Sequence, residues 1–125
     1  MRVKEAMNKA VAIEKDISLK EAAKIMSDRN IGCLIILKND KITGIITERD
    51  IMKNVSNIDR KISSAMSKNV ITINHDESID NAALIMAKNK IKKLPVVEKE
   101  NLIGIITATD IVANYDILNE DFLLD

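Results

Sequence analysis

An internal repeat constrains the fold of this chain more than any other feature. Residues 18–51 align without a gap with residues 78–111, and the tetrapeptide Gly-Ile-Ile-Thr occurs in both copies, at 44–47 and at 104–107. Repeats of this length each form one supersecondary unit, and stacked units share a core. We therefore expect two similar halves related by a pseudo-two-fold axis within one compact module. Their predicted ranges are 1–58 and 59–125, the second ending in an acidic tail.

Each half shows the same predicted order of elements. A short extended segment precedes a helix that opens at Ser18 or Ser78, where a hydroxyl suits the N-cap. Two apolar strands joined by a short polar turn follow and read as an antiparallel hairpin. A second helix then starts at Thr47 or Thr107. The fold class is α+β, with two β-α-β-β-α repeats. Pro95 has no backbone donor, so it is expected to begin its strand or to lie on an edge strand.

Composition excludes several classes of function. Nineteen basic residues balance nineteen acidic ones and aromatic residues make up 2% of the chain, which argues against nucleic-acid binding by charge or by stacking. The single cysteine, Cys33, cannot form an internal disulfide and reads as a small buried apolar residue. His75 has no metal-ligating partner at suitable spacing and reads as a loop or cap residue. No catalytic set, signal peptide or membrane span is recognised, so we expect a cytoplasmic protein that is not an enzyme and contacts no membrane.

The strand-to-helix junctions carry the residues best suited to chemistry. Thr47 and Asp50 have capping-box spacing, and Thr107 and Asp110 repeat it. A cap explains both pairs without any ligand. The functional alternative adds a sugar: an ionised carboxylate only accepts hydrogen bonds, so two adjacent ribose hydroxyls can donate to it. Unpaired backbone amides at the helix start would favour a phosphate beside it.

The Gly-apolar-x-Thr-x-x-Asp pattern, present twice, resembles the signature of the CBS domain (cystathionine β-synthase domain). The resemblance covers roughly residues 3–114. It implies two halves packed sheet to sheet, with clefts that bind adenosine ligands such as AMP, ADP, ATP or S-adenosylmethionine as regulatory ligands rather than as cofactors. It assigns ribose binding to Asp50 and Asp110, and assistance near the phosphate to Thr47 and Thr107. It assigns the adenine walls to residues that include Ile13, Ile31, Cys33 and Leu34 in the first half, and Lys93, Leu94 and Pro95 in the second.

The two halves differ where ligand specificity would be set. Arg49 lies inside the first motif and offers a forked guanidinium to a phosphate, whereas the second motif has Thr109 there. Thr72 matches a hydroxyl position common in the family, and the first half has Ala12 instead. The two clefts are therefore expected to be unequal. Lysines of the run 88–93, with Lys93 at its end, face either solvent or a phosphate.

Three functions remain open from the sequence. The chain is best interpreted as a regulatory module that binds an adenosine ligand and signals to an unknown partner protein, with homodimer assembly through its helices. A structural or interaction module without nucleotide binding is the first alternative, and a nucleic-acid-binding regulator is the second. The tail at 114–125 is acidic and carries apolar residues at helical spacing, which predicts packing on the body or on a partner.

Overall fold

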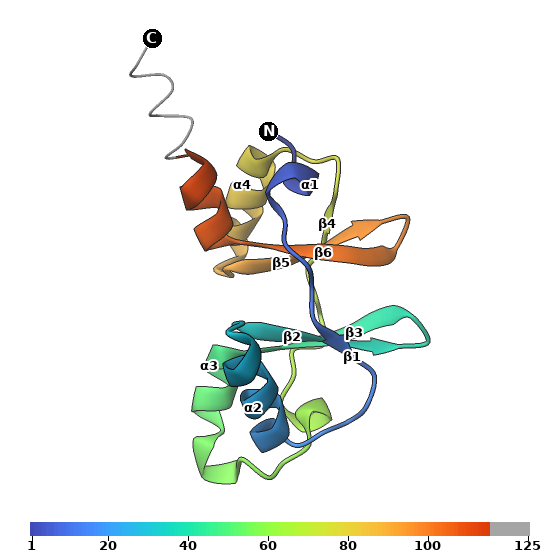
Figure 1. Ribbon diagram of the computed structural model, residues 1–125, viewed down its shortest axis with the longest axis vertical. Coiled ribbons are helices and arrows are strands. Elements are labelled where there is room, and N and C mark those ends of the chain that lie inside the picture. Colours follow the sequence, from blue (N-terminus) through green and yellow to red (C-terminus); the bar gives the residue numbers. More distant parts are fainter. Residues whose placement is uncertain (116–125) are drawn as a thin grey trace. The chain divides into compact units, whose positions relative to one another are not determined.

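The computed structural model describes residues 1–115. The chain divides into two compact units (Figure 1). The central unit is Val11–Val70, and the terminal unit combines Met1–Ala10 with the chain from Ile71 onward. Each unit holds one three-stranded sheet, β1-β2-β3 in the central unit and β4-β5-β6 in the terminal unit. The predicted α+β class with two β-α-β-β-α repeats is confirmed.

The central unit follows the predicted order closely. Its elements are β1 (Ala12–Ile13), α2 (Leu19–Arg29), β2 (Cys33–Lys38), β3 (Lys41–Thr47), α3 (Glu48–Lys53) and the short 3-10 turns η1 (Val55–Asn57) and η2 (Ile62–Ser64). Ser18 caps α2 by accepting a hydrogen bond from the Glu21 amide, and Asn30 ends the helix in the left-handed conformation. The Ser18 cap is the one that the sequence predicts, and asparagine is a common residue at a left-handed helix end.

The terminal unit repeats the strands and longer helices, with α1 (Val3–Ala6) in the place that η2 has in the central unit. It also contains β4 (Ile73–Asn74), α4 (Ile79–Asn89), β5 (Lys93–Glu98), β6 (Asn101–Thr107) and a helix over residues 108–115. In both units the first strand pairs in parallel with the second, and the second pairs antiparallel with the third. The central strand of each sheet is therefore the first strand of its hairpin, β2 or β5.

The expectation for Pro95 is wrong, because this residue is the third of β5, and β5 is the central strand. The structure accommodates it because the neighbouring strand pairs only from Val96 onward, through Ile73. In the central unit the same place is taken by Ile35, whose amide donates to the Val11 carbonyl at 3.0 Å. Proline cannot make that bond, so the pairing of β4 with β5 begins one residue later in the repeat than the pairing of β1 with β2.

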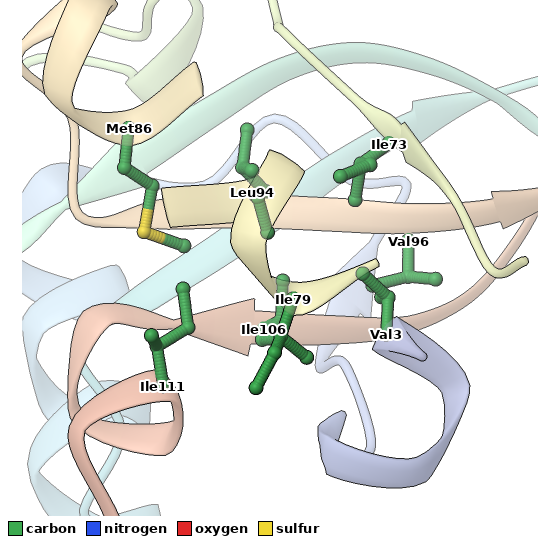
Figure 2. Packing of buried hydrophobic residues seen from close by; sticks show 9 residues of the cluster. Val3, Ile73, Ile79, Met86, Leu94, Val96, Ile106 and Ile111 are labelled. Atoms are coloured by element: carbon green, nitrogen blue, oxygen red, sulfur yellow. The ribbon is translucent and has the colours of Figure 1, made fainter. Parts of the chain in front are cut away.

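Each unit has its own hydrophobic core. The central core is built around Leu19, Ala22, Leu34 and Ile46, none of which is exposed. The terminal core is shown in Figure 2, where Val3, Ile79, Leu94, Val96 and Ile106 lie together with Ile73, Met86 and Ile111. The helices contribute core residues that recur about every 3.6 positions, and the strands contribute every second residue.

The segment that begins each repeat belongs to the compact unit that contains the rest of the other repeat. Residues 1–10 precede the first repeat in sequence, yet α1 packs against α4 and β6 of the terminal unit. Val3 donates its amide to the Glu77 carbonyl at 2.8 Å, and Ile62 makes the matching bond to Ile17 in the central unit, also at 2.8 Å. The compact units and the sequence repeats are thus two different divisions of the chain.

The C-terminal prediction concerns residues that mostly lie outside the described range. Tyr115 belongs to the described part and packs against the terminal core. The other apolar positions named for the tail fall within residues 116–125, which the structure does not describe. Within residues 1–115, no helix combines the length and the apolar character needed to cross a bilayer.

Candidate ligand-binding site

The first strand-to-helix junction is closed by a complete capping box. Thr47 ends β3 and caps α3, and the Oδ2 atom of Asp50 accepts from the Thr47 amide at 2.9 Å and from its hydroxyl at 3.1 Å. The Asp50 amide donates back to the Thr47 hydroxyl at 3.4 Å. One oxygen of the carboxylate therefore does all of the capping. The predicted cap is confirmed here.

The second junction has nearly the same geometry. The Oδ2 atom of Asp110 accepts from the Thr107 amide and from its hydroxyl, each at 2.9 Å, and the Asp110 amide donates to that hydroxyl at 3.2 Å. All four side chains of the two junctions are partly buried. Capping thus explains the recurrence of Thr and Asp, but it uses only Oδ2 of each carboxylate.

The two carboxylates differ at Oδ1. Asp110 Oδ1 accepts a hydrogen bond from the Nδ2 atom of Asn8 at 2.8 Å, across 102 positions of sequence. Asp50 Oδ1 accepts no hydrogen bond from any residue between 1 and 115. A carboxylate oxygen can only accept, so Asp50 keeps one outward acceptor for a ligand while Asp110 has a protein donor in that place.

Asn8 was not among the residues that the sequence singled out. The available signal was the repeat of Ala-Met at 6–7 and 65–66, which aligns Asn8 with Ser67. The structure confirms that correspondence: Asn8 pairs antiparallel with Ile105, and Ser67 pairs antiparallel with Ile45. Both segments extend a hairpin strand by one bridge, next to the junction that the strand leads into.

The glycine of each motif permits this bridge. A Cβ on Gly104 would lie 2.8 Å from the Asn8 carbonyl oxygen and 2.7 Å from the Met7 sulfur. A Cβ on Gly44 would overlap the sulfur and Cγ of Met66. Real Cβ atoms do not approach other heavy atoms so closely, so a side chain at Gly104 would clash with the backbone, whereas one at Gly44 would require the Met66 side chain to move.

A second pair of asparagines was also missed. Asn54 donates through Nδ2 to the Asp50 carbonyl at 2.8 Å, and Asn114 donates in the same way to Asp110 at 2.7 Å. In α3 this bond satisfies one of the carbonyls that the end of the helix leaves without a partner. The signal for both bonds was present in the sequence, because the two asparagines are separated by the same interval as the two motifs.

The expected supply of backbone amides at the helix starts is smaller than predicted. The Glu48 amide donates to the Gly32 carbonyl at 3.0 Å, and the Ala108 amide donates to Lys92 at 2.9 Å. The amides of Asp50 and Asp110 serve the caps. A phosphate beside either junction would therefore depend mainly on side chains.

Arg49 is the charged residue inside the first motif for which the sequence predicts a phosphate contact. It is exposed and forms no hydrogen bond or ion pair with any residue in the described range. Thr109, at the matching place, is also exposed, and Lys93 is half-buried at the start of β5 directly across from Thr107. Cys33 takes the corresponding place across from Thr47 and is buried. Thr72 is exposed and precedes β4.

The apolar candidates fall into two groups. Leu34 and Leu94 have no exposed surface and belong to the cores of their own units, so their side chains face the helices. Pro95 is also fully buried but lies one residue further along, on the other face of its strand. Ile13 and Ile31 are partly buried and pack against the central core. Adenine contact through the two leucines would therefore require the core to open.

The remaining polar clusters do not form a metal site. Within residues 1–115 no group of three or more histidine, cysteine or acidic side chains is placed to bind an ion. His75 lies in the turn between β4 and α4, as predicted, with Nε2 at 3.4 Å from Asp76 and 3.6 Å from Glu98. Lys4 forms an ion pair with Asp76 at 3.0 Å. The hydrogen bond from Lys4 is the main reason that the pKa of Asp76 lies below its usual value.

Comparison with protein families gives two matches along this chain. The model of the CBS domain matches residues 3–57 and again residues 61–116. The chain is 38% identical over 112 residues to L-aspartate semialdehyde sulfurtransferase of Methanocaldococcus jannaschii, covering 87% of this chain but only 22% of that enzyme. It is 30% identical over 117 residues to the CBS domain-containing protein YhcV of Bacillus subtilis, covering 90% of this chain and 84% of YhcV.

Solved structures support the same relationship. The CBS domain pair of protein MJ0100, in complex with 5′-methylthioadenosine and S-adenosyl-L-methionine, superimposes with a TM-score of 0.87 at 36% identity. The match covers 93% of this chain and 96% of that one. The similarity therefore extends over both units and both junctions.

Proposed function

The chain belongs to the CBS domain family, and on that premise we propose that it is a regulatory module that binds an adenosine-containing ligand. The ligand would report to a partner protein, and the module itself would catalyse nothing. The same kind of module forms about a fifth of the sulfurtransferase it resembles, which fits a role beside an enzyme rather than as one. We further propose that it acts in the cytoplasm, because its single cysteine allows no internal disulfide, as is usual for proteins of that compartment.

One observation carries the proposal: the Oδ2 atom of Asp50 maintains a helix cap, while its Oδ1 atom receives no hydrogen bond from residues 1–115. An outward carboxylate oxygen is suited to the hydroxyls of a ribose, as in dinucleotide-binding folds. The bound 5′-methylthioadenosine and S-adenosyl-L-methionine of the MJ0100 domain pair both contain a ribose diol, which supports the same ligand class here.

The other proposed roles follow from placement. Thr47 holds the Asp50 side chain by two hydrogen bonds, so it is a positioning residue for the ribose contact. Arg49 is one residue away, exposed and charged, and would contact a phosphate if the ligand is a nucleotide. Ile13 and Ile31, which keep some exposure, are better suited to touch a base than Leu34 is.

Signalling requires a ligand to favour one arrangement of the protein or its partners through differential affinity. Exposed apolar side chains on the helices supply a surface for such contacts: Leu84 of α4 is 68% exposed and Val112 is 59% exposed. We propose that these helical faces form a homodimer, in which each surface meets its own copy. Light scattering should give twice the chain mass at tens of micromolar, a concentration at which a dimer of micromolar affinity would form.

The interaction module without a ligand keeps one specific observation in its favour. The capping boxes account for every hydrogen bond between Thr and Asp at both junctions, and they need no ligand. Nucleic-acid binding has only the lysines near the end of α4 to support it, against a net charge of zero. Both alternatives can be tested in the same experiment as the proposed adenosine-binding function.

A thermal-shift titration distinguishes the three functions. The wild-type protein is heated with increasing AMP, ADP, ATP, S-adenosylmethionine, 5′-methylthioadenosine or a short DNA duplex. We expect at least one adenosine ligand to raise the melting temperature with dose, because a ligand that binds only the folded state stabilises it. No rise with any adenosine ligand would contradict the proposal, and a rise with DNA alone would favour the nucleic-acid reading.

Asp50→Asn is a variant matched to this geometry. An asparagine can keep the cap with its single oxygen, but it places an amide donor where the outward acceptor was. The cap should therefore survive while ribose binding is lost. If the melting-temperature rise persists in Asp50→Asn at the same ligand concentrations, the ribose is not bound at this residue.

A further inference from the structure

We propose that Asn8 closes the Asp110 junction to a ribose diol, so that an adenosine ligand binds first at Asp50. This inference rests on the proposed function and specifies which of its two motifs is used. It assigns Asn8, a residue outside both motifs, as the one that makes the two motif carboxylates unequal in acceptor capacity. The contact that carries it is the Asn8 Nδ2 to Asp110 Oδ1 hydrogen bond of 2.8 Å.

The acceptor capacity of each carboxylate gives the physical basis. A carboxylate oxygen has about two lone pairs, so each side chain offers about four positions for donors. In both junctions Oδ2 already accepts two hydrogen bonds from threonine. Asp50 keeps both positions on Oδ1, which is enough for the two hydroxyls of a ribose. Asp110 has given one of these positions to Asn8, so it can accept only one hydroxyl unless Asn8 leaves.

The donor identity at this contact does not depend on the assignment of the Asn8 amide. An ionised carboxylate has no proton to give, so whichever end of the amide faces it must be the NH2 group. The bond is charge-assisted on the acceptor side, which makes it stronger than a contact between neutral groups. A ribose hydroxyl has to compete with it directly.

Asn8 is held in place by its backbone as well as by its side chain. The Asn8 amide donates to the Ile105 carbonyl at 2.8 Å, and the Ile105 amide donates back at 2.9 Å. Gly104 lies beneath the Asn8 carbonyl, where a side chain would not fit. The amide group is therefore delivered to Asp110 from a fixed point, with only its own side-chain rotamers to order.

The central unit has the same frame without the same donor. Ser67 exchanges both backbone hydrogen bonds with Ile45, each at 3.0 Å, just as Asn8 does with Ile105. The Ser67 side chain is shorter than that of asparagine and makes no hydrogen bond with the described residues. At the Oδ1 atom of the carboxylate, the difference between the junctions thus lies in one side chain at equivalent positions, Asn8 in one and Ser67 in the other. This suggests an exchange of the two residues as the test.

The experiment is a calorimetric titration of the full chain with AMP and, separately, with S-adenosylmethionine. Four proteins are compared: wild type, Asn8→Ser, Ser67→Asn, and the double exchange. Both positions are exposed, and their backbone bridges do not involve the side chains, so all four should fold. Circular dichroism and the melting temperature without ligand serve as the control for folding.

We expect the wild type to show one tighter site and Asn8→Ser to gain affinity at the second by about tenfold, close to the lower end of the range for a hydrogen bond to a charged group. Ser67→Asn should weaken the tighter site by a similar factor, and the double exchange should move that site to Asp110. Adding Asp50→Asn or Asp110→Asn to each protein identifies which junction is occupied.

The outcomes separate this inference from the proposed function. Two equal sites in the wild type, or no change in Asn8→Ser, would overturn the role of Asn8 and leave adenosine binding intact. Weaker binding in Asn8→Ser would also overturn it, because Asn8 would then be helping a ligand rather than excluding it. No binding of either ligand to any of the four proteins would contradict the proposed function itself.

Discussion

At the scale of single residues, one carboxylate oxygen decides what each motif can do. Thr and Asp recur because together they start a helix, and this requirement is met at both junctions with nearly equal distances. The outward oxygen is not needed for the helix and is available for a ligand at Asp50. A structural pattern and a binding site can therefore share a side chain, provided that each uses a different atom.

Arg49 tests whether the ligand carries a phosphate. Arg49→Ala should weaken AMP binding by about 1.5–3 kcal/mol if the guanidinium contacts the phosphate, and it should leave adenosine binding nearly unchanged. Part of that loss should shrink as salt is added, because exposed charges are screened. Calorimetry of both proteins with both ligands measures the difference. An equal loss for AMP and adenosine would mean that Arg49 shapes the site without contacting phosphate.

Asp16 provides a pH test of the central unit. Hydrogen bonds from the Ser63 hydroxyl at 2.6 Å and from its amide at 3.1 Å lower the pKa of this exposed carboxyl below its usual 3.8. A lowered pKa means that the folded state favours the ionised form, so the contribution to stability is present above pH 3.8 and is lost as the pH falls through the lowered pKa.

Urea unfolding across the acidic range measures this contribution. The free energy of unfolding of the wild type should exceed that of Asp16→Asn at neutral pH, and the difference should diminish as acid protonates Asp16. Asn has a similar shape but does not titrate, which makes it the matched control. Parallel pH profiles for the two proteins would show that the Ser63 contact does not favour the ionised carboxylate.

At the scale of secondary-structure elements, the bridges at Ile45 and Ile105 explain why each motif begins with glycine. The neighbouring segment crosses directly over the glycine, and its methionine side chain fills the space that a Cβ would need. The two sites differ in what a Cβ would meet. At Gly44 it meets a flexible side chain, whereas at Gly104 it also meets a backbone carbonyl.

Alanine at each glycine should therefore give unequal results. Both variants should be destabilised, Gly104→Ala by about 1–3 kcal/mol, as for other overpacked positions, and Gly44→Ala by less. Adding Met66→Ala should recover much of the loss in Gly44→Ala by making room. Adding Met7→Ala should recover little in Gly104→Ala, because the Asn8 carbonyl remains. Chemical denaturation of the five proteins, wild type included, checks this, and equal recovery at both sites would contradict it.

The sequence predicts most of the elements because their signals are local. Ser18 and Ser78 open helices, the apolar strands flank short polar turns, and Thr47 caps a helix, all through neighbours within four residues. Pro95 was placed wrongly because its cost depends on where a different strand begins to pair. The Asn8 contact was missed for the same reason: it joins residues 102 positions apart, and local rules say nothing about such a pair.

At the scale of the whole molecule, the chain's first residues complete the unit that contains the second repeat. Val3 has no exposed surface and lies in the terminal core with Ile79, Val96 and Ile106 (Figure 2). This burial joins residues that lie far apart in the sequence. The placement of residues 1–10 in the terminal unit also brings Asn8 to Asp110. The proposed difference between the two ligand sites therefore follows from this placement.

Val3→Ala measures how firmly this segment belongs to the core. Removing two buried methyl groups should lower the free energy of unfolding by about 1–3 kcal/mol. Glu5→Ala, on an exposed position of the same short helix, should change it by no more than about 0.5 kcal/mol. Denaturation with urea compares the two. Similar small effects for both would indicate that the segment frays instead of packing.

The central claim is that a ribose diol donates to the outward oxygen of Asp50, and a thermodynamic cycle tests it most directly. AMP and 2′-deoxy-AMP are each titrated calorimetrically into wild type and Asp50→Asn. We predict that removing the 2′-hydroxyl costs about 1.5–3 kcal/mol in the wild type, the value of a hydrogen bond to a charged group, and far less in the variant. Equal costs in both proteins would mean that Asp50 does not bind the ribose.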